Sequence, residues 1–67
     1  MSNKELLETL NKLKATQVTQ WQYYFLRALW ISTRRGEDFG AVSPDDVERL
    51  QGMLLLHFPK IHAKEFA

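Results

Sequence analysis

The side chains that could do chemistry are few, and their spacing is poor for it. His57 and His62 stand five positions apart on either side of Pro59. Two imidazoles share one helix face when they are four positions apart, so this pair does not predict a metal site. The chain also has no cysteine to supply a thiolate ligand. We therefore expect neither a metal ion nor a cofactor.

Catalysis has equally little support in the residue pattern. The acidic pairs Glu37–Asp38 and Asp45–Asp46 are explained by a solvated loop and by the first turn of a helix. No serine has a histidine next to it in the sequence. The segment Gly36–Gly40 lacks both the glycine spacing and the preceding strand of a phosphate-binding turn. The sequence predicts a protein without catalytic residues, which is not an enzyme.

Length and charge set further bounds. The chain has 67 residues, enough for a single small domain over residues 1–67. Its net charge of +1 is too close to balance to indicate a nucleic-acid or membrane-binding protein. The opening residues Met1–Glu5 carry no basic-then-apolar signal, and no apolar run reaches the roughly 18–20 residues of a membrane span. We expect a cytoplasmic protein without a membrane partner.

Apolar residues recur at helical spacing through the first half of the chain. Ser2, followed three positions later by Glu5, predicts a capping box that starts a helix. Eleven residues then keep one phase at 100° per residue: Leu6, Leu7, Leu10, Leu13, Val18, Trp21, Tyr24, Phe25, Ala28, Leu29 and Ile31. This pattern predicts one continuous helix over about residues 3–34. The alternative is a break near residues 15–17 with Thr16 as a second N-cap, although no glycine or proline supports it.

A second helix is predicted over about residues 44–58. Ser43 is a good N-cap, Pro44 suits the first helical position, and two acidic residues follow. Gly52 inside this helix costs about 1 kcal/mol relative to alanine, which indicates close approach of another backbone. Pro59 ends the helix, and the residues after it form one short C-terminal turn.

These elements predict an all-α helical hairpin, or a small three-helix bundle if the first helix breaks. Gly36 is expected to adopt the left-handed conformation that closes the first helix, with Arg34 and Arg35 in its last turn. A second helix of about 14 residues spans only ~21 Å of its longer neighbour. It leaves part of the apolar stripe uncovered, so we expect a homodimer whose self-association residues are Leu6, Leu10 and Leu13.

A second apolar strip predicts contact with another protein. Tyr23, Leu26 and Trp30 lie at positions i, i+3 and i+7, on the helix face opposite the main stripe. Tyrosine and tryptophan are enriched among the residues that dominate binding energy at interfaces. The alternative is that this face packs inside the chain. The pattern favours a non-catalytic protein–protein interaction module of the adaptor, regulator or inhibitor type, with this strip as its binding surface.

The alternative function is a small nucleic-acid-binding regulator. Its contact residues would be Lys12, Arg27, Arg34 and Arg35 on the long helix. Basic residues spread so widely are also typical of any solvated helix face. The acids Asp45 and Asp46 would repel phosphate from the start of the second helix, so interaction with another protein is the favoured hypothesis.

Overall fold

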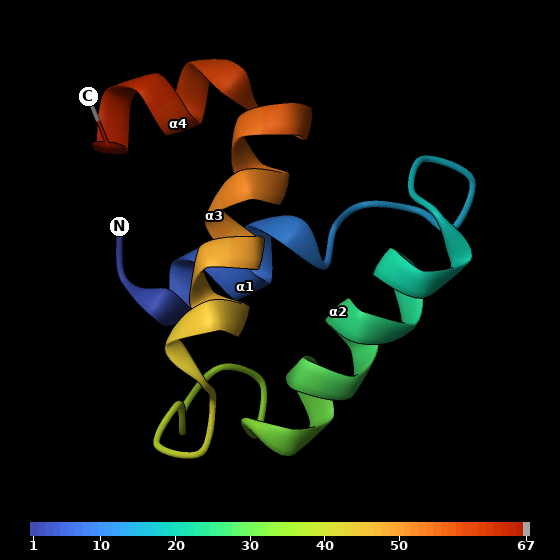
Figure 1. Ribbon diagram of the computed structural model, residues 1–67, viewed down its shortest axis with the longest axis vertical. Helices are drawn as coiled ribbons and strands as arrows, with labels where there is room; N and C mark the ends of the chain where they lie inside the picture. The colour runs from blue at the N-terminus through green and yellow to red at the C-terminus, as the bar shows by residue number, and fades with distance from the viewer. Residues whose placement is uncertain (67) are drawn as a thin grey trace.

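The protein folds into four helices joined by turns (Figure 1). The computed structural model describes residues 1–66, and this part of the chain contains no β-strand. The helices are α1 (Asn3–Leu10), α2 (Gln20–Ser32), α3 (Pro44–His57) and α4 (Pro59–Phe66). The predicted all-α class is confirmed. Among the described residues, no helix is both long enough and apolar enough to cross a membrane.

Helix α1 begins at the predicted capping box. The Glu5 amide donates to Ser2 Oγ at 3.1 Å, and the Ser2 amide donates to Glu5 Oε1 at 3.3 Å. The helix ends after Leu10, because Asn11 caps it. Both the backbone amide and the side-chain amide of Asn11 donate to the Leu7 carbonyl at 2.9 Å. An asparagine side chain that bonds to a carbonyl of the last turn competes with continued helix.

The predicted continuous helix over residues 3–34 is wrong, because residues 11–19 form turns. A second capping box starts α2: the Gln22 amide donates to Thr19 Oγ1, and the Thr19 amide donates to Gln22 Oε1, both at 3.1 Å. The break includes residues 15–17, as the alternative expected, but the N-cap is Thr19 and not Thr16. Two reciprocally satisfied amides stabilise a helix start at Thr19 without any glycine or proline.

The connection from α2 to α3 passes through three consecutive left-handed residues. Gly36 has a φ of 87°, which confirms its predicted conformation, and Arg34 and Arg35 have φ values of 52° and 60°. The two arginines therefore follow the helix, whereas the sequence predicted them in its last turn. Buried Thr33 organises this turn: its hydroxyl donates to the Leu29 carbonyl at 2.6 Å and accepts from the Gly36 amide at 3.0 Å.

Helix α3 begins as predicted, with the Asp46 amide donating to Ser43 Oγ at 3.2 Å and Pro44 in the first turn. Its span of Pro44–His57 agrees with the predicted second helix. Pro59 ends α3 and also starts α4, since proline suits the first position of a helix. The C-terminal segment is thus a helix of eight residues and not one short turn.

The core lies where α1 and α3 pack together, and α4 also contacts α3. Its buried residues come from α1, the following turn, α2 and α3: Leu6, Leu7, Leu10, Leu13, Leu26, Leu50, Met53 and Leu54. The expected self-association residues Leu6, Leu10 and Leu13 are only 1%, 0% and 6% exposed, so the prediction that they stay uncovered is wrong. Because residues 11–19 form turns, α1 can pack against α3, and this packing covers these leucines within one chain.

Candidate interaction site

Helix α2 presents to the core the face that the sequence assigned to a partner. Leu26 is 2% exposed and belongs to the core, while Tyr23 and Trp30 are half-buried and Trp30 packs against the core. The structure does not place these three residues together on an exposed surface. The prediction assumed that one continuous helix aligns the apolar faces of its two halves. The turns before Gln20 separate α1 from α2, so the two helices no longer share one face.

The large apolar side chains that the structure exposes lie elsewhere. Trp21, Tyr24 and Ile31 of α2 are 58%, 61% and 77% exposed. Leu55 and Leu56 of α3 are 53% and 68% exposed. The sequence interpretation placed the three α2 residues on the main apolar stripe of one continuous helix. Single exposed apolar residues are ordinary, so the feature to explain is that three of these five lie on α2.

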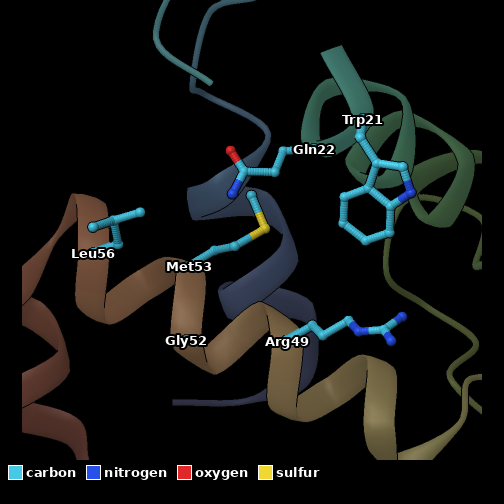
Figure 2. A pocket seen from close by; sticks show the side chains of 6 residues that line it. All are labelled: Trp21, Gln22, Arg49, Gly52, Met53 and Leu56. Carbon is cyan, nitrogen blue, oxygen red and sulfur yellow. The ribbon is translucent and has the colours of Figure 1, made fainter. Parts of the chain in front are cut away.

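A groove open to solvent separates α2 from α3. In these two helices, both fully described, no Cα atom of one lies within 8 Å of a Cα atom of the other. The groove has a volume of about 290 Å³ and is lined by Trp21, Gln22, Arg49, Gly52, Met53 and Leu56. Figure 2 shows the Met53 side chain between the two helices, with α1 behind it. This volume lies near the lower end for ligand pockets, about 300–1,000 Å³, and suits one or two inserted side chains.

The Trp21 ring, which lines one side of the groove, makes two contacts within the chain. The indole of Trp21 stacks on Phe25, with ring centroids 5.0 Å apart and an interplanar angle of 10°. The guanidinium carbon of Arg49 lies 5.7 Å from the centroid of the Trp21 ring, which is cation–π range. Arg49 also reaches Asp46 Oδ1 at 3.3 Å, and its side chain is 58% exposed. The Arg49 guanidinium therefore has further N–H donors that can bind an anionic group.

Gly52 has no neighbour that explains it. A Cβ atom at this position would meet nothing within 4 Å, counting the described part of the chain. The sequence interpretation expected another backbone to approach Gly52, and the chain itself supplies none. The glycine lies instead in the lining of the groove (Figure 2). A glycine on the exposed side of a helix interior destabilises the folded chain, and no contact in the described part of the chain offsets this cost.

The basic residues considered for nucleic-acid contact do not form one surface on a common helix. Lys12 lies in the turns after α1, and Arg34 and Arg35 lie in the left-handed turn after α2. Arg27, on α2, leans over the ring of Tyr23 at 5.1 Å. The break over residues 11–19 removes the shared helix face on which the nucleic-acid hypothesis placed them.

Some titratable residues outside the groove contact neighbouring residues. His57 ends α3 and His62 belongs to α4, where its ring lies 5.0 Å from that of Phe66. Residues 1–66 contain no cluster of three histidine, aspartate or glutamate side chains that could hold a metal ion. Hydrogen bonding to Glu37 raises the pKa of Lys4, which joins α1 to the α2–α3 loop. Among the described residues that line the groove, only Arg49 has an ionisable side chain.

The sequence contained one signal that would have found the start of α2 correctly. Thr19-Gln20-Trp21-Gln22 fits the capping-box pattern, which places Trp21 in the first turn of a new helix. Nothing in the sequence alone paired Trp21 with the Gly52–Leu56 segment, because that proximity depends on how α2 and α3 each pack against α1.

Compared with known protein families, curated proteins and solved structures, the chain gives no match.

Proposed function

We propose that this chain is a non-catalytic protein–protein interaction module whose α2–α3 groove receives a helix of another protein. The observation that supports it most is the open space beside Gly52, which lines the groove and has no atom of the described chain within 4 Å of where a Cβ would lie. Helix-in-groove recognition needs a concave apolar surface, and close approach of two helices is easiest where one lacks a side chain. The groove fulfils both requirements.

The lining also indicates the chemistry of the partner helix. Met53 and Leu56 offer apolar contacts, and the flexible thioether of methionine adapts to side chains of different shape. Arg49 keeps free donors at the edge of the groove beside Trp21. Tryptophan and arginine are the residue types that most often dominate binding energy. We therefore propose an amphipathic helix that inserts one large apolar side chain and brings a carboxylate to Arg49.

Two synthetic helical peptides provide the direct test. Both carry leucines at positions i, i+3, i+4 and i+7, and they differ only in a glutamate or a lysine beside the apolar face. In NMR titrations of the labelled protein, we expect the glutamate peptide to shift the Trp21 indole and Met53 methyl signals at lower concentration. Equal affinity for both peptides would contradict the role of Arg49. Shifts confined to other residues would contradict the groove.

A variant that fills the groove supplies the matched control. Gly52→Leu places a side chain in open space, so the protein should still fold, but the glutamate peptide should bind at least about 10-fold more weakly. Leu55→Glu changes an exposed leucine of the same helix that does not line the groove, and should leave the affinity unchanged. Unchanged affinity of Gly52→Leu would overturn the proposal.

A further inference from the structure

The outward face of α2 carries a heptad-like apolar seam that the groove does not explain. Trp21, Tyr24, Ala28 and Ile31 follow one another at intervals of three, four and three positions, which is the a–d spacing of paired helices. All four are exposed, Tyr24 and Ile31 by 61% and 77%. Over Gln20–Ser32 the only charged residue is Arg27. A solvent face of this composition is typical of a helix that is covered by another helix.

We propose that this seam joins two copies of the chain, with the two α2 helices antiparallel. A two-fold axis near position 26 sets Tyr24 of one copy opposite Ala28 of the other, and Trp21 opposite Ile31. A large side chain thus meets a smaller one in each layer. Parallel pairing would instead set Tyr24 against Tyr24 and Ala28 against Ala28, so that one layer is crowded and the next is empty. The sequence of sizes along α2 is therefore self-complementary in the antiparallel direction.

The charge on α2 is compatible with this arrangement. With Trp21 and Ala28 at heptad position a, Arg27 takes position g. Position g faces position g in an antiparallel pair, so the two Arg27 side chains lie on the same side of the seam. Each guanidinium leans over its own Tyr23 ring, toward the start of its helix. In the antiparallel pair this separates the two charges by about 9 Å along the axis, close to the screening length at moderate salt. The remaining repulsion predicts that added salt strengthens the dimer.

The size of the seam sets the expected affinity. Its side chains expose on the order of 400 Å² per copy, given their exposed fractions and the usual size of aromatic side chains. Two copies would bury about 800 Å², which is below the roughly 1,200–2,000 Å² of stable interfaces. We therefore expect a reversible dimer with a dissociation constant on the order of 100 μM. Of the seam residues, only Trp21 also lines the groove, so Gly52→Leu should weaken this association little.

Sedimentation equilibrium from about 10 μM to 1 mM tests the dimer. We expect the wild-type chain to dimerise in this range, and Tyr24→Glu and Ile31→Glu each to weaken the dimer at least about 10-fold. Leu55→Glu, an exposed leucine away from the seam, is the matched control and should have no effect. Circular dichroism verifies that each variant folds. A wild-type monomer at 1 mM, or an equal loss with Leu55→Glu, would overturn the proposal.

Cysteine crosslinking tests the direction of pairing, and the absence of native cysteine makes its result simple to interpret. In the antiparallel pair, an Ile31→Cys chain brings its two thiols no closer than about 15 Å along the axis, beyond disulfide reach. A mixture of Ile31→Cys and Trp21→Cys chains should form the mixed disulfide. A disulfide between two Ile31→Cys chains, without the mixed product, would show parallel pairing and contradict the antiparallel seam.

Discussion

A Cβ atom at Gly36 would lie 3.2 Å from the Cα atom of Lys4, so the loop between α2 and α3 rests directly on the backbone of α1. Gly36 is buried and its φ is 87°. The Lys4 ammonium binds the Glu37 carboxylate next to this contact. This close approach of two backbones thus coincides with a conformation that only glycine adopts without strain.

Gly36→Ala should destabilise the fold by about 1–3 kcal/mol. The added methyl group would meet backbone atoms that cannot rotate away, and alanine is strained at positive φ. Urea unfolding followed by circular dichroism measures the change. Gly40→Ala is the control, because its new methyl group would meet only the flexible Asp38 carboxylate. Equal losses for both variants would contradict this explanation.

Gly52→Ala should have the opposite effect and stabilise the isolated chain by about 1 kcal/mol. Alanine has the higher helix propensity, and the new methyl group meets nothing within 4 Å in the described chain. Thermal melts at low protein concentration provide the measurement. A loss of stability would mean that Gly52 has a packing neighbour inside the chain.

Arg35→Gly should also stabilise the protein, by about 1 kcal/mol, because a left-handed conformation is costly for arginine and not for glycine. Arg35→Lys keeps the charge and the side-chain length, and should melt like the wild type. If both substitutions changed stability equally, the cause would be the lost guanidinium contacts and not the backbone conformation.

The two faces of α2 should respond very differently to truncation. Leu26→Ala should cost about 2–5 kcal/mol because Leu26 is buried in the core, which is enough to unfold a domain this small. Tyr24→Ala should change stability by no more than about 0.5 kcal/mol at concentrations where the chain is monomeric. Comparable losses for the two variants would show that α2 is rotated about its axis from the orientation described.

The contact between Met1 and Glu65 predicts a specific pH dependence. The Met1 ammonium donates to Glu65 Oε2 at 2.7 Å, which lowers the pKa of Glu65 below its ordinary 4.5 and raises the pKa of the amino group above 8.0. Stability from the carboxylate is present above pH 4.5 and is lost as pH falls through the lowered value. Stability from the ammonium is present below pH 8.0 and is lost as pH rises through the raised value.

NMR titration of the Glu65 carboxyl carbon measures this effect directly, and we expect a midpoint below 4.5. Glu65→Gln removes the acceptor charge and should return the amino group toward its ordinary titration. Because both groups are exposed, the accompanying change in melting temperature should be small. A Glu65 midpoint at or above 4.5 would contradict the contact.

Local sequence signals were sufficient wherever a few neighbouring residues satisfy one another. Ser2 with Glu5 starts α1, Ser43 with Pro44 starts α3, and Gly36 is left-handed, all as predicted. These features depend on hydrogen bonds and backbone preferences within a few residues, so they do not require the rest of the chain. The all-α class follows from the same short-range information.

The tertiary structure decided which side of each helix faces inward. Periodicity in the sequence marks apolar faces, but α2 is apolar almost all round, so its sequence alone does not select between Leu26 and Tyr24 for the core. That choice depends on where α1 lies after the turns over residues 11–19. Packing of Leu13 and Leu26 with the α1 leucines turns Trp21, Tyr24 and Ile31 outward, and it leaves the groove beside Gly52.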